Sequence, residues 1–167
     1  MNCISLIGMP GAGKSTLGIM LAKSLAKNFV DTDVLIQTRS GQHLQDIIDN
    51  QGYLTLRILE EQVLLDLEVS NSVIATGGSA VYSRAGMKRL KSLGVIVYLD
   101  VSFNNIEERI TNFSTRGLAC APGQSLKEIY EERTTLYKNA ADIIIASSDG
   151  SPEKVLNRLE TELANYN

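Results

Sequence analysis

The chain has 167 residues, of which 44% are hydrophobic and 21% are charged, and its formal net charge is −3. This size and composition suit a globular protein, and we expect residues 1–167 to form a single domain. The charge argues against general binding to nucleic acid or to an anionic membrane, and no apolar run approaches the roughly 20 residues that span a bilayer.

The number of cysteines and the start of the chain indicate the cellular compartment in which the protein works. Cys3 and Cys120 are too few to form a disulfide framework, which favours a reducing environment. The N-terminus enters the first β-rich run directly and leaves no room for a signal peptide. We therefore expect a cytoplasmic protein. Separately, we expect it to act as a monomer.

The first recognisable motif lies at residues 8–15, which read Gly-Met-Pro-Gly-Ala-Gly-Lys-Ser and complete the pattern G-x-x-x-x-G-K-[ST]. A β-rich run at residues 3–8 leads into it, and apolar residues at helical spacing follow it. A glycine-rich turn between a strand and a helix N-terminus gathers backbone N–H groups where a polyphosphate can bind. Lys14 then reaches the outer phosphates, and the Ser15 hydroxyl can ligate magnesium. A chance match to the pattern is the alternative, but the β-rich run before the motif and the helical spacing after it predict that the motif binds a nucleoside triphosphate.

The second β-rich run, residues 29–33, ends in Asp31-Thr32-Asp33. On an extended segment, two residues spaced i, i+2 point to the same face. Phosphoryl transfer needs one carboxylate beside a magnesium ion and another that faces the acceptor hydroxyl, and this pair can supply both. Asp33 can alternatively cap the helix that follows it.

Further along the chain, helical and β-rich segments alternate. Leu56, Leu59, Val63 and Leu67 form one helical stripe, and β-rich runs follow at residues 72–76, 95–100 and 142–147. Asp100, at the end of its run, is either a second candidate metal ligand or a helix cap. Residues 111–124 show no regular pattern and are expected to form a short lid.

Two helix starts are marked near the C-terminus. Ser125-x-x-Glu128 reads as a capping box, and Ser151-Pro152 places a capping side chain before a proline. The alternation of strands and helices predicts an α/β fold in three layers, with a five-stranded parallel sheet and helices on both faces. Ligands of such sheets bind at the carboxyl ends of the strands.

With these motifs in place, the chain resembles the shikimate kinase family of P-loop small-molecule kinases. The matching segments are Gly8 to Thr16, Asp31-Thr32-Asp33, Arg57-x-x-Glu60, Ala75-Thr76-Gly77-Gly78, Arg116, and Glu132-Arg133-x-x-Leu136-Tyr137 before Ala141-Asp142. The resemblance implies ATP- and Mg²⁺-dependent transfer to a hydroxyl of a small hydroxy acid, shikimate, giving its 3-phosphate.

The resemblance also implies a role for each matching residue. ATP would bind at Gly11, Ala12, Gly13, Lys14, Ser15, Thr16 and Arg109, and magnesium at Ser15 and Asp31. Shikimate would bind at Asp33, Arg57, Gly77, Gly78 and Arg133, with Lys14, Asp33 and Arg116 as the catalytic residues. In this interpretation Asp33 is the base, Arg57 and Arg133 hold the substrate carboxylate, and Asp100 is structural.

The spacing of Arg57 and Glu60 agrees with such a role. Residues at i, i+3 lie on one helix face, so Glu60 can hold the guanidinium of Arg57 in place. A planar guanidinium also matches a carboxylate in a two-pronged pair, which lysine cannot form. A solvated surface charge is the alternative, and we accept it for Arg84, Arg89 and Arg158.

Some positions depart from the family pattern, mostly around the expected acceptor pocket and lid: Tyr53, Leu56, Ser79, Gly117 and Thr135. Two alternatives therefore stay open. One is a related kinase with another acceptor, such as a gluconate-like polyhydroxy acid. The other is a regulatory module that binds a nucleotide without catalysis.

Overall fold

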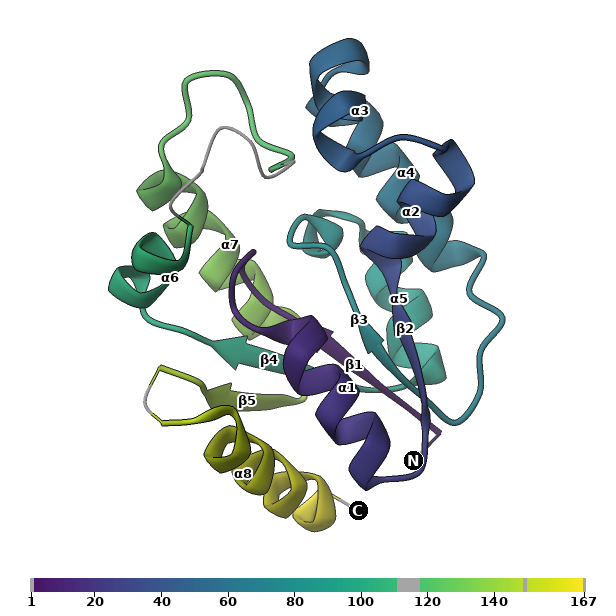
Figure 1. Ribbon diagram of the computed structural model, residues 1–167, viewed down its shortest axis with the longest axis vertical. Helices are drawn as coiled ribbons and strands as arrows, with labels where there is room; N and C mark the ends of the chain where they lie inside the picture. Colours follow the sequence, from purple (N-terminus) through teal and green to yellow (C-terminus); the bar gives the residue numbers. More distant parts are fainter. Residues whose placement is uncertain (1, 111–117, 149, 167) are drawn as a thin grey trace.

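The computed structural model describes residues 2–110, 118–148 and 150–166 (Figure 1). The strands are β1 (Cys3–Ile7), β2 (Asn28–Asp31), β3 (Ser72–Ala75), β4 (Gly94–Asp100) and β5 (Ile143–Ala146). The helices are α1 (Lys14–Ser24), α2 (Thr32–Ser40), α3 (Leu44–Gln51), α4 (Tyr53–Leu65), α5 (Arg84–Leu93), α6 (Phe103–Arg109), α7 (Leu126–Ala140) and α8 (Pro152–Asn165), with the 3₁₀ turn η1 (Ala80–Tyr82) before α5.

The five strands form one parallel sheet in the order β2-β3-β1-β4-β5. Leu6 of the central strand β1 pairs with Ala75 of β3 and with Val97 of β4. Every residue of β1 and β3 is buried, because helices cover both faces of the sheet. The continuous apolar runs in the sequence therefore belong to a sheet with no exposed face at its centre.

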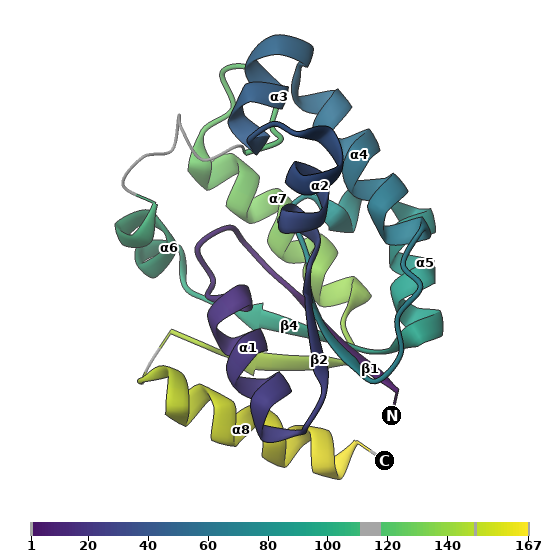
Figure 2. The same cartoon turned by 45° about the vertical axis from the view of Figure 1, so that its right-hand side comes forward.

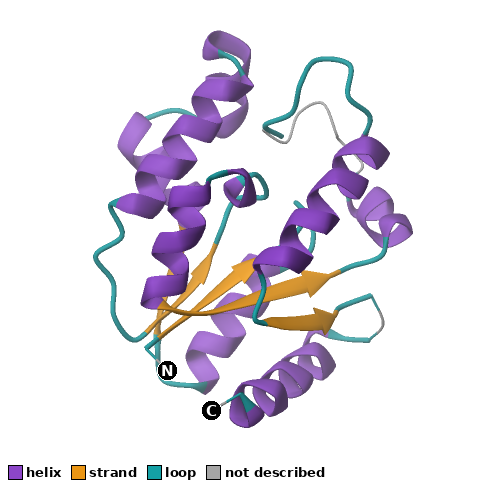
Figure 3. Ribbon diagram, turned by 180° about the vertical axis from the view of Figure 1, so that it is seen from behind, coloured by secondary structure: helices purple, strands orange, loops and turns teal. Residues whose placement is uncertain are grey.

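Helices form the outer two layers. In Figures 1 and 3, α1 and α8 lie on one face of the sheet, while α5 and α7 lie on the other. Figure 2 shows α2, α3 and α4 grouped together beyond the end of β2. The predicted three-layer α/β fold with a five-stranded parallel sheet is confirmed.

The strand order determines how Asp31 reaches the phosphate loop. β3 lies between β1 and β2, so the strand that carries Asp31 is not a direct neighbour of the strand before the phosphate loop. The predicted run 29–33 also ends early, because α2 begins at Thr32. Asp31 caps this helix: its Oδ1 accepts from the backbone N–H groups of Asp33 at 3.0 Å and Val34 at 3.4 Å. Asp33 is thus not the cap, and helix geometry rather than strand alternation orients it.

The two marked helix starts are confirmed. Ser125 and Glu128 form a reciprocal capping box at α7, and α8 begins at Pro152 after Ser151. In the described part of the chain, no helix is long and apolar enough to cross a membrane.

A small second hydrophobic cluster joins the helices near the end of β2 to the segment before α7. Ile36, Ile47, Leu56 and Val63 pack there together with Ala119. Of the expected lid, residues 111–117 lie outside the described residues, and residues 118–124 form a loop. The single-domain assignment and the lid boundaries stay predictions.

Candidate active site

The phosphate loop connects β1 to α1 at the carboxyl end of the sheet. Gly13 adopts φ 89°, a left-handed conformation that favours glycine, and the helix begins at the next residue. The Lys14 side chain is buried, and its Nζ donates to Gly8 O at 2.8 Å and to Met9 O at 2.9 Å. Burial lowers the pKa of Lys14 to about 8, although the nearby carboxylates of Asp33 and Asp31 raise it.

Ser15 and Asp31 meet beside this loop. The Ser15 hydroxyl donates to Asp31 Oδ2 at 2.6 Å, while the other oxygen of that carboxylate caps α2. A hydroxyl and a carboxylate oxygen are hard ligands of the kind that Mg²⁺ takes, and Mg²⁺ commonly binds few protein groups together with phosphates and water. The pair therefore fits a magnesium ion that is shared with a bound nucleotide.

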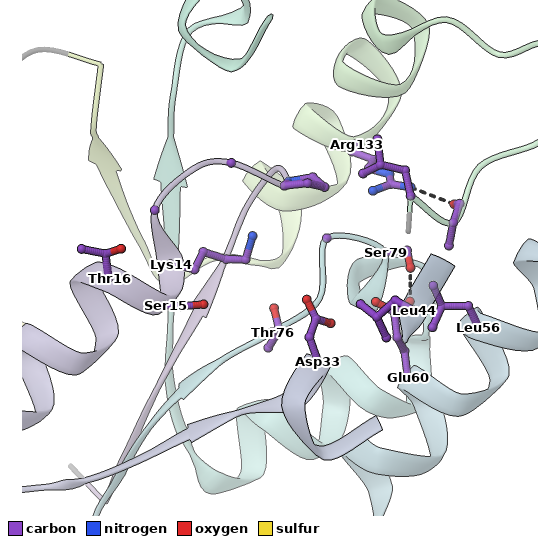
Figure 4. Close-up of a pocket in the computed structure, with 16 residues that line it drawn as sticks. Lys14, Ser15, Thr16, Asp33, Leu44, Leu56, Glu60, Thr76, Ser79 and Arg133 are labelled. Atoms are coloured by element: carbon purple, nitrogen blue, oxygen red, sulfur yellow. Dashed lines mark hydrogen bonds between the residues drawn. The ribbon is translucent and has the colours of Figure 1, made fainter. Parts of the chain in front are cut away.

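A cavity of about 290 Å³ opens between the phosphate loop and α4. Its lining includes Pro10, Gly11, Gly13, Lys14, Ser15, Thr16, Asp33, Leu44, Leu56, Glu60, Thr76, Gly78, Ser79, Leu118, Ala119 and Arg133. Figure 4 shows Lys14 and Ser15 on one side of this cavity, with Glu60, Ser79 and Arg133 on the other and Asp33 between them. We call it the acceptor cavity.

Asp33 reaches the cavity from the first turn of α2. Burial raises the pKa of Asp33 to about 6; Lys14 opposes this shift, and Asp31 adds to it. A carboxyl group that titrates near neutrality can accept a proton from a hydroxyl at working pH. Asp33 is therefore placed and tuned as a candidate base.

Glu60 is a second buried carboxyl in the cavity, and the sequence interpretation gave it only a supporting role. It accepts a hydrogen bond from the Ser79 hydroxyl (Figure 4), and burial raises its pKa to about 8. A side chain at Gly77 would overlap Glu60 and would lie 2.8 Å from Asp33 Oδ1. Glycine at position 77 thus lets the two carboxyl groups approach the same turn.

Arg133 and Arg57 converge on one backbone oxygen. Nη2 of Arg133 donates to Ala119 O at 2.9 Å, and Nη2 of Arg57 donates to the same oxygen at 3.1 Å. Arg133 is 1% exposed. The Nε atoms of both arginines are buried and have no hydrogen-bond partner among the described residues. Buried N–H donors without partners are rare, and here they border the acceptor cavity or its neighbour.

The predicted contact between Glu60 and Arg57 is not made. Within the described ranges no salt bridge links Arg57 to an acid, because Glu60 is engaged by Ser79. The Arg57 guanidinium instead lies 3.8 Å from the centre of the Tyr82 ring and 5.2 Å from that of Tyr53. It also lines an adjoining cavity of about 570 Å³ rather than the acceptor cavity itself.

The glycine-rich turn is held by other groups. The Gly77 N–H donates to Thr32 Oγ1 at 3.0 Å, and Gly78 O accepts from the Tyr137 hydroxyl. Gly78 lines the acceptor cavity. These backbone groups therefore border the cavity but already have partners in the protein.

Arg109 lies on the opposite side of the phosphate loop. Its Nη1 donates to Gly11 O at 3.3 Å, and it borders a separate cavity of about 240 Å³. That cavity is lined by Gly11, Ala12, Gly13, Thr16, Leu17, Arg109, Ser147, Gly150, Pro152 and Val155. Because Gly11, Gly13 and Thr16 line both cavities, the phosphate loop separates two compartments.

Two candidates remain, Arg116 and Asp100. Arg116 lies outside the described residues. Asp100 accepts from the Tyr98 hydroxyl at 3.1 Å and lies 3.8 Å from Lys138 Nζ, so its carboxylate is occupied by structural partners. It does not cap α6 either, since Ser102 accepts from Asn105 N there.

The geometry agrees with what comparison finds. A family model described as Shikimate kinase matches residues 10–164. The chain belongs to the shikimate kinase family. Shikimate kinase from Sulfurihydrogenibium sp. is 34% identical, with coverage of 98% of each chain, and that from Paracidovorax citrulli is 39% identical over 88% of this chain and 83% of its own length. The solved shikimate kinase of Acinetobacter baumannii in complex with shikimate is 30% identical and superposes with a TM-score of 0.89 over 99% of this chain and 94% of its own.

Family membership makes the chain a small-molecule kinase that uses a nucleotide substrate, and the comparisons give no support to a non-catalytic module. The structure shows where most of the residues that depart from the family pattern lie. Leu56 and Ser79 line the acceptor cavity, and Tyr53 borders the adjoining cavity with Arg57. Thr135 lies in α7, where its hydroxyl donates to Glu131 O at 3.4 Å, and Gly117 lies outside the described residues.

Proposed function

We propose that this chain transfers the γ-phosphoryl group of ATP to a hydroxyl of shikimate, giving shikimate 3-phosphate, with Mg²⁺ as the cofactor. The observation that carries the proposal is the position of the phosphate loop between two cavities. One cavity contains Asp33 and Arg133, and the other contains Arg109. A donor whose phosphates lie on the loop can therefore meet an acceptor in the first cavity while its nucleoside occupies the second.

On the donor side, the residues from Gly11 to Thr16 surround the phosphates with backbone N–H groups at the N-terminus of α1. Lys14 contacts the outer phosphates, and Arg109 lies against the base. Ser15 and Asp31 hold the metal directly or through water. Bound there, Mg²⁺ neutralises charge on the phosphate oxygens. Arg116 is proposed to close over the transferring group.

On the acceptor side, Asp33 receives the proton of the attacking hydroxyl, consistent with a pKa of about 6. Arg57 and Arg133 bind the carboxylate of shikimate, since both are directed at one oxygen atom, Ala119 O. Gly78 lines the pocket, and the absence of a side chain at Gly77 leaves room for Glu60 and Asp33 beside it.

An acceptor panel tests this proposal. ADP release is measured with ATP and Mg²⁺ in the presence of shikimate, the same ring without its carboxylate, gluconate and a nucleoside monophosphate. We expect turnover with shikimate and a loss of about 100-fold or more in kcat/KM without the carboxylate, because the buried guanidinium of Arg133 and the partly buried guanidinium of Arg57 lose their partner. No turnover with shikimate above background would refute the proposal, and turnover with gluconate alone would favour the alternative acceptor.

We also propose that the enzyme is a cytoplasmic monomer. The described helices contain no membrane span, and the proposed substrates are small polar molecules. Sedimentation velocity at assay concentrations is expected to give one species of 18.2 kDa. A stable dimer would contradict the oligomeric part of this proposal.

A further inference from the structure

Tyr82, which the sequence interpretation passed over, touches both arginines of the proposed carboxylate clamp. It ends η1, directly after the glycine-rich turn. The centre of its ring lies 3.8 Å from Arg57 Cζ and 5.4 Å from Arg133 Cζ. Arg57 belongs to α4 and Arg133 to α7, so one aromatic ring lies against arginines of two different helices.

The hydroxyl group of Tyr82 holds the ring in place through a hydrogen bond. The Tyr82 hydroxyl donates to Glu132 Oε1, and Oε2 of the same carboxylate accepts from Gln124 Nε2 at 3.2 Å. Glu132 is the chain neighbour of Arg133 on α7. The hydroxyl therefore ties the ring to the helix that carries one of the two guanidinium groups.

An aromatic ring supports Arg57 because the acid expected to hold it, Glu60, is engaged by Ser79. Ser79 donates to Glu60, and Arg57 has no acidic partner in the ranges that the structure describes. A guanidinium stacks well on an aromatic face, and the attraction strengthens where water is excluded. Tyr53 adds a second ring, whose centre lies 5.2 Å from Arg57 Cζ.

We propose that Tyr82 is a positioning residue for acceptor binding: its ring holds Arg57 and Arg133 so that both guanidinium groups address one carboxylate. This inference rests on the proposed function of the two arginines. Tyr53 assists on the outer side of Arg57. The convergence of both Nη2 atoms on Ala119 O is the geometry that the ring maintains.

The test compares Tyr82→Leu, which removes the aromatic face, with Tyr82→Phe, which keeps the face and removes the hydroxyl. We expect Tyr82→Leu to raise the KM for shikimate about tenfold, with kcat and the KM for ATP within about twofold of the wild type. Tyr82→Phe is expected to raise it by no more than about threefold. Tyr130→Leu is the matched control, since that ring packs edge-on against Phe103 and its hydroxyl donates to Val101 O.

A double-mutant cycle separates positioning from a general structural defect. If Tyr82 acts through Arg57, then Tyr82→Leu changes the KM for shikimate much less in an Arg57→Ala background than in the wild type. Equal fold-changes in both backgrounds, an unchanged KM in Tyr82→Leu, or a parallel rise in the KM for ATP would each overturn the inference.

A second measurement does not depend on the acceptor. The ¹⁵N relaxation of the Arg57 Nε–Hε group reports the mobility of the guanidinium in the unliganded enzyme. We expect this group to be rigid in the wild type and in Tyr82→Phe and mobile in Tyr82→Leu; equal mobility in all three would refute the positioning role. If the wild type does not turn over shikimate, the proposed function fails while this relaxation measurement still decides the role of Tyr82.

Discussion

At the scale of single residues, the acceptor cavity moves three side chains towards titration near neutral pH. Burial lowers the pKa of Lys14 to about 8 and raises those of Asp33 and Glu60 to about 6 and about 8. Burial favours the neutral form of each group, so the lysine loses its proton more readily and the two acids lose theirs less readily. Only Asp33 combines such a shift with a place between the phosphate loop and the far wall of the cavity (Figure 4).

Asp33→Asn is therefore expected to reduce kcat by about 100-fold or more, because the amide cannot accept the proton of the attacking hydroxyl. ATP binding is expected to stay within about threefold of the wild type, since the proposed phosphate contacts come from Lys14 and the backbone N–H groups at the start of α1. Single-turnover kinetics and ATP titration measure the two quantities. An equal loss of ATP binding would show a structural role for Asp33 instead.

At the scale of elements, the start of α2 serves stability and the proposed metal site at once. Asp31 Oδ1 caps the helix, whereas Asp31 Oδ2 accepts from Ser15 on α1. The two oxygens of one side chain thus join β2 and α2 to the phosphate loop across the intervening strand β3. A substitution at Asp31 that keeps the capping oxygen and removes the charge would separate helix capping from metal binding.

Asp31→Asn and Asp31→Ala form the matched pair for this purpose. Asparagine is as good an N-cap as aspartate, so Asp31→Asn is expected to keep the thermal stability but to need about tenfold more Mg²⁺ for half-maximal activity. Asp31→Ala is expected to lose about 1 kcal/mol of stability as well. Thermal melts and Mg²⁺ titrations of activity provide the readouts. If Asp31→Asn has an unchanged Mg²⁺ requirement, Asp31 is a cap and not a ligand.

The elements also show where sequence reasoning succeeds. The phosphate loop, the five strands, the capping box at Ser125 and the start of α8 at Pro152 were predictable because each depends on neighbouring residues, although the Ser151 side chain makes no capping hydrogen bond. The placement of Asp31 as the cap of α2 was not, since a strand ending at residue 31 or at residue 33 gives the same apolar pattern. Strand order was equally hidden, because β3 enters between β1 and β2 only through packing of distant segments.

The side-chain partners in the site were the least predictable part. The i, i+3 spacing of Arg57 and Glu60 allows their contact, but it cannot show that Ser79 competes for Glu60 from 19 residues away. Tyr82 carries no motif of its own. Its position after the glycine-rich turn was the one available signal, and only the tertiary structure brings its ring against two arginines.

At the scale of the whole molecule, the buried acid Glu60 makes folding stability depend on pH. The folded chain raises its pKa from 4.5 to about 8, so the folded state binds this proton more tightly than the unfolded state does. The unfolded state therefore holds fewer protons between these two values, and the contribution of Glu60 to stability falls as pH rises through that range. Below pH 4.5 both states are protonated and the penalty disappears.

Glu60→Gln, which mimics the protonated form, is expected to match the wild type in stability near pH 5 and to exceed it by about 3 to 5 kcal/mol near pH 8.5. Urea unfolding at a series of pH values measures the difference. Ser92→Ala, which removes the exposed hydroxyl that donates to Arg89 O, is a suitable control without a titrating group. Parallel stability curves for Glu60→Gln and the wild type would show that Glu60 is ionised in the folded chain.

The carbonyl oxygen of Ala119, which accepts from both Arg57 and Arg133, also affects how binding free energy is divided between folding and catalysis. The guanidinium of Arg133 is buried and that of Arg57 is partly buried, so both lose water, and here that loss occurs when the chain folds. An acceptor carboxylate entering the clamp would then exchange one oxygen partner for another instead of stripping water from two cations. The affinity for the acceptor is therefore set by the difference between two free energies: that of the two guanidinium groups with the acceptor carboxylate, and that of the same groups with Ala119 O.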